Sequence, residues 1–128
     1  MATGIEHWKK EPEDHDYPAA VSYLTLVMPH DTALKVVGEM QRNDLAHRKA
    51  KDLLRASELA LLDEKNAHVA SDLRKAQRGE KLSPVLLVRG DASRGHPLLV
   101  ADGYHRVCAS YHLDEDADIP CKIADLPT

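Results

Sequence analysis

Aromatic residues and cysteines are scarce in this sequence. Its 128 residues include no phenylalanine, one tryptophan and four tyrosines. A hydrophobic core must therefore be built mainly from leucine, valine, alanine and isoleucine. The only cysteines are Cys108 and Cys121, and they do not form a Cys-x-x-Cys pair. A disulfide framework normally needs more cysteines, so we expect two reduced thiols in a cytoplasmic protein.

Long apolar runs and an excess of basic charge are also missing. The longest apolar runs, such as residues 85–88 and 98–101, are far too short to span a bilayer. Residues 1–13 lack the apolar segment of a signal peptide, so we expect no contact with a membrane. The formal net charge is −4, whereas domains that bind nucleic acid present a basic face. A general electrostatic attraction to nucleic acid is therefore not expected, although a local basic patch remains possible.

The composition is that of one ordinary globular domain, with 43% hydrophobic and 30% charged residues. The spacing of apolar residues predicts helices over residues 18–28, 31–41 and 67–78. Asp31 and Asn66 are the expected N-caps of the second and third of these helices, because their side chains can accept from free backbone N–H groups.

Two segments of the first half are harder to assign. Residues 1–16 are charged, and we expect them to be loosely ordered, although Trp8 and Tyr17 could pack this arm onto the domain or contact a partner. Residues 48–54 fit either an edge strand or a helix, and the spacing alone slightly favours a helix.

The second half predicts the order helix, strand, strand, helix, strand. Residues 84–89 and 98–101 are apolar runs separated by a turn rich in Gly, Asp, Ser and Pro. A helix is expected after Gly103, and residues 119–123 form the last strand. Pro120 places that strand at an edge or makes it the start of a strand. The fold class is therefore α+β, with a small mixed sheet flanked by helices.

The junction between the second strand and the following helix carries the most chemistry. It reads Asp102-Gly103-Tyr104-His105-Arg106. The first turn of a helix leaves N–H groups unpaired, and these donors together with the helix dipole favour an anion. Gly103 allows a ligand to approach the backbone, and Arg106 adds a guanidinium suited to phosphate oxygens. His105 could transfer a proton, and Asp102 could bind a metal or act as a base.

Each of these residues also has an ordinary structural explanation. Gly103 fits a simple turn, and Asp102 fits a helix cap. His105 and Arg106 fit a solvated helix surface. The five residues alone are thus weak support for a binding site, and both explanations remain open.

The wider order of elements resembles the ParB/sulfiredoxin superfamily. The resemblance rests on a proline-led strand (residues 82–88), a strand ending in Asp-Gly followed by a His-Arg helix (residues 98–111), and a closing Ile-Pro strand (residues 119–123). It covers about residues 67–123. It also implies that the region 49–54 holds the first strand of the family, and we take that reading over a helix there.

This resemblance implies that the chain has two parts. Residues 46–128 would be the ParB/sulfiredoxin-like domain. Residues 1–45 lie outside the resemblance, and we expect them to form an N-terminal arm and helices packed on the core.

Members of this superfamily bind nucleotides with the phosphates on the helix N-terminus. The resemblance therefore implies a nucleotide (ATP, ADP or CTP) with Mg²⁺, bound by Gly103, Tyr104, His105 and Arg106, with Asp102 and His105 as candidate catalytic residues. The implied function is a nucleotide- or phosphate-binding domain, acting as a phosphotransferase or nucleotide hydrolase. The alternative is a non-catalytic module of the same fold that recognises a protein partner or a second copy of the chain.

The individual activities of the superfamily fit unequally. Sulfiredoxins need a cysteine before the His-Arg pair, where this chain has Tyr104, and Cys108 lies one helical turn later in a core-facing position. Chromosome-partition ParB proteins carry further DNA-binding and dimerisation domains after this one. Because Thr128 lies five residues past the last predicted strand, we expect neither those domains nor sequence-specific DNA binding. A free serine kinase motif, Asp-Gly-His-x-Arg, is nearest, although the histidine is shifted by one place. No partner for its catalytic glutamate is located in this sequence, and Glu58 and Glu64 lie upstream as candidates only.

Several other residues are weaker candidates. His68, in the first turn of its predicted helix, and Arg55, beside the implied first strand, could contact a nucleotide. Lys75 could reach a phosphate, but a favourable charge near a helix C-terminus explains it better. The eight histidines include no pair at the i,i+4 spacing of a helical zinc site, so no protein-held metal is expected.

Overall fold

The computed structural model describes residues 8–127. Helices and strands alternate irregularly along the chain, which confirms the predicted α+β class. The elements are α1 (Asp16–Leu24), α2 (His30–Arg42), β1 (Ala46–Lys49), α3 (Ala50–Ser57), α4 (Ala67–Gln77), β2 (Val85–Val88), a short 3₁₀ turn (Ala92–Arg94), β3 (Leu99–Asp102), α5 (Tyr104–Leu113) and β4 (Asp118–Ala124).

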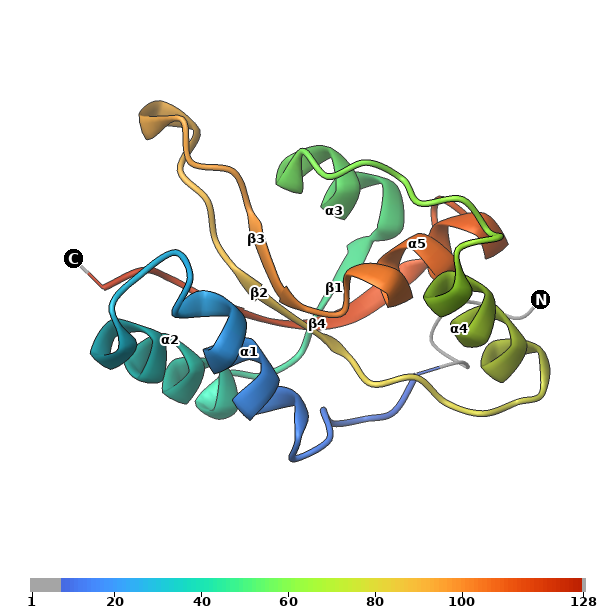
Figure 1. The fold of residues 1–128 in the computed structure, drawn as a ribbon, viewed down its shortest axis with the longest axis horizontal. Helices are drawn as coiled ribbons and strands as arrows, with labels where there is room; N and C mark the ends of the chain where they lie inside the picture. The colour runs from blue at the N-terminus through green and yellow to red at the C-terminus, as the bar shows by residue number, and fades with distance from the viewer. Residues whose placement is uncertain (1–7, 128) are drawn as a thin grey trace.

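The strands form one mixed sheet with the order β1-β4-β2-β3. The central pair, β2 and β4, is parallel, and each edge strand pairs antiparallel with its neighbour. Figure 1 shows α1 and α2 on one face of this sheet and α3, α4 and α5 on the other. All four residues of β2 are buried, as expected for a central strand covered by helices on both faces.

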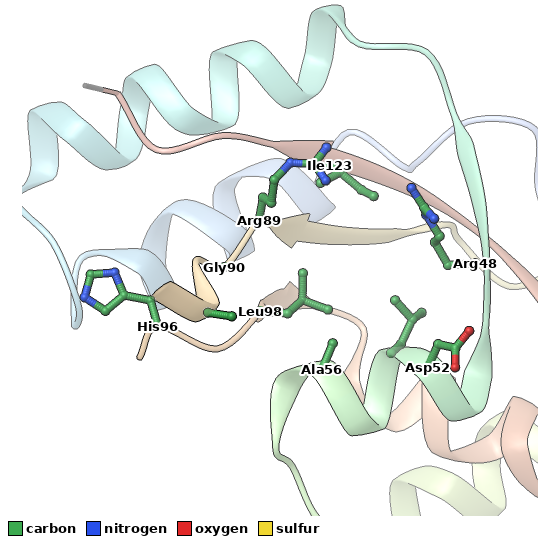
Figure 2. A pocket seen from close by; sticks show the side chains of 10 residues that line it. Arg48, Asp52, Ala56, Arg89, Gly90, His96, Leu98 and Ile123 are labelled. Atoms are coloured by element: carbon green, nitrogen blue, oxygen red, sulfur yellow. The ribbon is translucent and has the colours of Figure 1, made fainter. Parts of the chain in front are cut away.

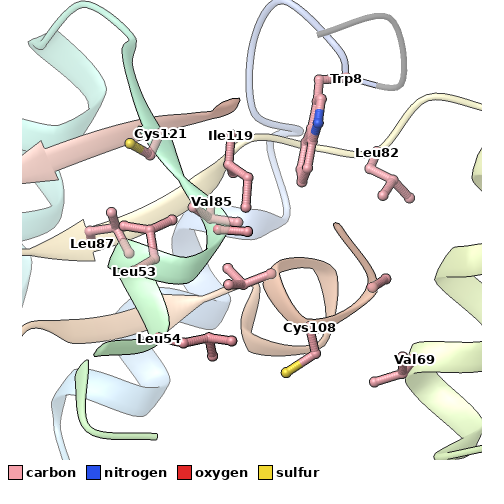
Figure 3. Close-up of a cluster of buried hydrophobic side chains, with 13 residues drawn as sticks. Trp8, Leu53, Leu54, Val69, Leu82, Val85, Leu87, Cys108, Ile119 and Cys121 are labelled. Atoms are coloured by element: carbon pink, nitrogen blue, oxygen red, sulfur yellow. The ribbon is translucent and has the colours of Figure 1, made fainter. Parts of the chain in front are cut away.

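Two apolar clusters fill the layers on either side of the sheet. Alternate residues of β2 point to opposite faces, so Val85 and Leu87 join one cluster while Leu86 and Val88 join the other. The first cluster, drawn in Figure 3, lies under α3, α4 and α5. The second contains the buried sides of α1 and α2. Both clusters consist mainly of Leu, Val, Ala and Ile, as the scarcity of aromatics predicts.

The N-terminal arm is tied to the domain from Trp8 onward. Trp8 is only 4% exposed and belongs to the first cluster. The backbone N–H of Lys9 donates to the carbonyl of Leu82 at 2.8 Å. The expectation of loose order is therefore wrong for residues 8–16, because one buried indole and a backbone bond fix the arm. Residues 1–7 of that prediction lie outside the described residues.

The helix boundaries agree with the sequence in part. The side chain of Asn66 accepts from the N–H groups of His68 and Val69, which confirms the predicted N-cap of α4. The N-cap of α2 is Pro29, so the prediction for Asp31 is wrong; Asp31 lies in the first turn instead. Helix α1 begins earlier and ends earlier than predicted.

The implied first strand is displaced from its predicted position. Strand β1 ends at Lys49, and α3 begins at Ala50, so the strand expected over residues 49–54 is wrong for all but its first residue. The buried residues of α3 have the spacing i, i+3, i+4, i+7, which places them on one helical face; they are Ala50, Leu53, Leu54 and Ser57. The helical periodicity was the better guide here.

Pro120 is not in an edge strand, because β4 lies between β1 and β2. The edge alternative is therefore wrong for the strand as a whole, whereas the alternative of a strand start fits the position of Pro120, close to the beginning of β4 at Asp118. Pro120 pairs with His47 of β1, and pairing of β4 with β2 begins only at Cys121. At the proline, β4 therefore has a neighbour on one side only, which is the local equivalent of an edge.

Candidate functional site

The turn between β3 and α5 depends on a glycine at position 103. Gly103 is the N-cap of α5 and has φ of 113°, a conformation that L-residues with a side chain rarely adopt. A Cβ atom at this position would lie 2.5 Å from Cγ1 of Val85 and 3.0 Å from Nη2 of Arg106. The backbone thus passes directly against the core strand β2, and only glycine fits this close approach.

The first turn of α5 presents its backbone donors without a side-chain cap. The N-cap residue of α5 is Gly103, which has no side chain that could accept from the N–H groups of the first turn. The first intrahelical bond runs from the N–H of Val107 to the carbonyl of Gly103 at 3.0 Å. The N–H groups of Tyr104, His105 and Arg106 precede that bond and have no helical acceptor. Together with the helix dipole they form a partial positive charge that favours an anion.

Arg106 is held close to this turn. Its Nη2 donates to Oδ2 of Asp102 at 2.9 Å and to the carbonyl oxygen of Pro84 at 3.3 Å. Its side chain is 18% exposed. Among residues 8–127, the Nε of Arg106 is the one buried side-chain nitrogen or oxygen without a hydrogen-bond partner. The guanidinium is therefore fixed in place but not fully satisfied by the protein.

Helix α4 supplies the opposite wall of a small cavity in front of this turn. The cavity has a volume of about 260 Å³. Almost every residue around it is polar or charged, and the residues are His68, Ser71, Asp72, Lys75, Asp102, Gly103, His105 and Arg106. The rings of His68 and His105 face each other across the two helices, with centroids 4.7 Å apart. The site thus combines cationic groups, two carboxylates and two imidazoles in one space.

Two groups in the cavity have shifted pKa values. Burial raises the pKa of the Asp72 carboxyl, and the cations Arg106 and Lys75 counteract only part of that effect. Burial lowers the pKa of the His105 imidazole, and the neighbouring His68 lowers it further. Both shifts favour the neutral form of the side chain. Burial is the main cause of both shifts, and titratable groups perturbed by burial in a cavity are candidates for a functional site.

The structure brings most of the predicted site residues together. His68, Asp102, Gly103, His105 and Arg106 all line the cavity. Their convergence follows from the packing of α4 against α5, which no sequence pattern specifies.

Two predicted ligand residues lie elsewhere. The hydroxyl of Tyr104 donates to the carbonyl of Ala60 and so ties α5 to the loop between α3 and α4. The side chain of Arg55 is exposed and pairs with Asp52 on its own helix at 3.2 Å. Neither side chain lines the cavity, although the N–H of Tyr104 remains in the first turn of α5. The expectation that Arg55 contacts the same ligand is therefore not supported by its position.

Three cavity residues were not singled out from the sequence as site residues. Ser71 and Asp72 were missed, and Lys75 was explained by the helix C-terminus. One sequence pattern does link these residues to His68. They follow it with the spacing i+3, i+4 and i+7, which places all four on one helical face. That face is recognisable as a site only once the turn at Gly103 is known to lie opposite it.

The two thiols, and a cluster of potential metal ligands in the N-terminal arm, lie outside this cavity. Cys108 and Cys121 are buried and unpaired, and burial raises the pKa of both, that of Cys121 to about 11. Within residues 8–127, the side chains that gather three potential metal ligands are Glu13, His15 and Asp16, and none of them lines the cavity. The cavity therefore offers neither a reactive thiol nor a preformed metal site.

Comparisons with known proteins leave the family unassigned. No protein-family profile matches this chain, and neither does any curated protein or any solved structure. The resemblance to the ParB/sulfiredoxin superfamily stays a prediction. Separately, no helix within residues 8–127 is long and apolar enough to cross a membrane.

Proposed function

We propose that the cavity between α4 and the turn at Gly103 binds the phosphate group of a nucleotide or of another phosphate-bearing small molecule. The observation that carries this proposal is the guanidinium of Arg106, which lines the cavity beside first-turn N–H groups of α5 that have no helical acceptor. Phosphate oxygens are suitable acceptors for both the guanidinium and the amides.

The size and the lining of the cavity indicate which part of a ligand it would hold. Ligand pockets for whole small molecules are usually about 300–1,000 Å³ and mostly apolar. This cavity is about 260 Å³ and is lined by polar side chains. It suits a phosphate group, and its aromatic surface is limited to the rings of His68 and His105, which contact each other. A nucleotide would therefore place its base and sugar outside the cavity, and recognition of the base would be weak.

Mg²⁺ would have to be held mainly by the ligand. The metal prefers oxygen ligands, and at nucleotide sites it is commonly bound by one or two carboxylates plus substrate phosphates. Asp72 and Asp102 are the carboxylates of the cavity, but they do not form a group of three potential ligands. Of the two, Asp102 is already paired with Arg106. Asp72 is thus the better candidate for contact with a phosphate-bound ion.

A second candidate function is turnover of the bound phosphate compound. The observation that favours it is the imidazole of His105, which lines the cavity together with Arg106 and whose pKa is lowered by burial. A neutral imidazole next to a phosphate can accept a proton from an attacking hydroxyl or water. The phosphotransferase or hydrolase activity implied by the resemblance to the ParB/sulfiredoxin superfamily would use His105 in this role.

The proposal is tested by ligand-dependent thermal unfolding. Inorganic phosphate, pyrophosphate, ADP, ATP, CTP and GTP at millimolar concentration, with and without Mg²⁺, are expected to raise the unfolding midpoint by roughly 2–6 °C when the ligand is near tenfold its Kd. Adenosine, which lacks the phosphate, should not. If none of the phosphate compounds raises the midpoint, the proposal is wrong. Phosphate release measured on the binding nucleotides then separates an enzyme from a binding module.

A matched pair of lysine and arginine variants locates the binding. Lys75 lines the cavity, whereas the neighbouring Arg74 on the same helix does not and is also exposed. Lys75→Ala should weaken phosphate binding by about two- to fivefold, as expected for a solvent-exposed charge. Arg74→Ala removes the same charge and should leave it unchanged. Equal losses in both variants would mean that only the overall charge matters.

Binding is also expected to depend on pH through His105. Sulfate is the suitable probe, because its charge is constant over the range in which histidine titrates. The pKa of His105 is lowered in the free protein, and a bound anion favours the imidazolium, so binding takes up a proton. Sulfate should therefore bind several-fold more tightly as the pH falls from about 7.5 to about 5.5.

The control for this pH dependence is another histidine. His105→Gln should remove most of the slope of sulfate affinity against pH. His47→Gln should keep the slope, because His47 is exposed on β1 and does not line the cavity. Isothermal titration calorimetry at several pH values measures both variants. An unchanged slope in His105→Gln would exclude this histidine from the site.

A further inference from the structure

A second and larger cavity lies between α3, the sheet and the β2–β3 hairpin. Its volume is about 450 Å³, within the usual range for small-molecule sites. Its residues come from α3, β1, β4 and the hairpin, and they are Arg48, Asp52, Leu53, Ala56, Arg89, Gly90, Ala92, His96, Leu98 and Ile123. It shares no residue with the cavity at Gly103. The two cavities are therefore separate.

The floor of this cavity is apolar surface of the sheet that the helices leave uncovered. Of residues 119–124 in β4, all are buried except Ile123, which is only half-buried. Leu98, just before β3, is also half-buried, and both side chains line the cavity. Elsewhere on this face the first apolar cluster covers the sheet. A ligand with an apolar body would bury these side chains, which is favourable in proportion to the area removed from water.

The walls of the cavity are fixed by backbone bonds. The N–H of Leu98 donates to the carbonyl of Ala56 at 3.0 Å, which joins the end of α3 to the hairpin. Asp91 and His96 exchange backbone bonds of 2.8 and 2.9 Å across the hairpin. A Cβ at Gly90 would lie 2.5 Å from the carbonyl oxygen of His96, so the two arms of the hairpin are in close contact there. The cavity is therefore preformed and would not need to be opened by a ligand.

Charged groups surround the opening. Figure 2 shows Arg89 and Arg48 around it, with Leu98 and Ile123 among the lining residues. Arg89 bonds to Asp125 through Nε at 2.7 Å, and Asp52 is paired with Arg55. Among residues 8–127, no carboxylate lies within 4.0 Å of Arg48 to form an ion pair. The uncompensated charge at the opening is therefore positive and belongs to Arg48.

From this arrangement we propose that the cavity binds a small carboxylate with an apolar body, with the carboxylate on Arg48 and Arg89 and the apolar body on Leu98 and Ile123. A guanidinium forms charge-assisted hydrogen bonds with a carboxylate, often two in parallel. A bare inorganic anion would gain no affinity from the apolar floor, because it would leave these apolar side chains in water. The ligand class therefore differs from that of the phosphate site.

The proposal is tested by NMR titration of the full chain with phenylacetate as the probe and phenylacetamide as its neutral counterpart. Phenylacetate should shift the backbone amide signals of Ala56, Leu98 and Ile123 saturably, with a Kd in the millimolar range expected of a small fragment. Phenylacetamide should bind at least about fivefold more weakly, because it lacks the charge. Equal binding of both probes, or no localised shifts with phenylacetate, would overturn the proposal.

Two arginine variants test whether Arg48 binds the carboxylate of the probe. Arg48→Ala should weaken phenylacetate binding by at least about fivefold. Arg94→Ala removes an exposed arginine from the same hairpin that does not line the cavity, and it should leave the Kd unchanged. Ala56→Phe places a ring at the wall and should abolish binding while the remaining amide signals stay dispersed. Retained binding in Ala56→Phe, or equal losses in both arginine variants, would contradict the assignment.

Discussion

Replacing Gly103 by alanine is expected to destabilise the fold by about 2–5 kcal/mol. The left-handed backbone at this residue, with φ of 113°, costs an L-residue with a side chain roughly 1–2 kcal/mol. The new Cβ would also lie 2.5 Å from Cγ1 of Val85 in the buried strand β2, and overpacking of a core typically costs about 1–3 kcal/mol more. Thermal unfolding should show a midpoint lowered by roughly 8–20 °C.

Gly79→Ala is the matched control for this prediction. Gly79 has φ of 78°, and a Cβ there would meet no atom within 4 Å. This substitution therefore carries the backbone cost without the collision, so a loss of only about 1–2 kcal/mol is expected. Similar losses in the two variants would show that the approach of Gly103 to Val85 does not constrain the fold.

A double-mutant cycle with Val85 isolates the collision itself. Val85→Ala removes the Cγ1 atom, which would lie 2.5 Å from the new Cβ, but keeps the Cβ of Val85 at 2.9 Å; it also creates a cavity of its own. The double variant Gly103→Ala/Val85→Ala should lose less free energy of unfolding than the two single variants lose in sum. The expected difference is about 0.5–3 kcal/mol, which is the range seen for residues in contact. Chemical denaturation of all four proteins gives this coupling energy. Strict additivity would contradict direct contact.

The sequence predicted best those features that depend on neighbouring residues. The N-cap Asn66, the apolar strand that became β2 and the helix after Gly103 all follow from local chemistry, and all are present. These features need only hydrogen bonds or periodicity within one element.

Features that depend on distant contacts were predicted poorly. Asp72 shares a helical face with His68, but that face becomes part of a site only because α4 packs opposite the turn at Gly103. The Tyr104 hydroxyl is used by the carbonyl of Ala60, 44 residues away in the chain. Pro120 could be placed only once the neighbours of β4 were known. Sequence patterns within one element do not contain this information.

Replacing Arg106 should have the largest effect on phosphate binding. Arg106→Met keeps a long apolar side chain but removes every donor of the guanidinium. Hydrogen bonds to charged groups contribute about 1.5–3 kcal/mol, so affinity for phosphate compounds should fall by roughly 10- to 100-fold. Some loss of stability is also expected, since Arg106 bonds to the carbonyl of Pro84 and to Asp102. Calorimetry at a temperature where the variant is folded separates the two effects.

Asp102→Asn is the control for Arg106→Met, because it should not weaken phosphate binding. Oδ2 of Asp102 accepts from Nη2 of Arg106 at 2.9 Å, so its negative charge competes with an incoming phosphate for the same guanidinium and repels it. The amide keeps the shape and a carbonyl oxygen as acceptor, but it removes the charge. Phosphate should therefore bind as well as in the parent or more tightly. If Asp102→Asn and Arg106→Met weaken binding equally, the pair acts only by holding the turn in shape, because removing a competing anion cannot by itself reduce affinity for phosphate.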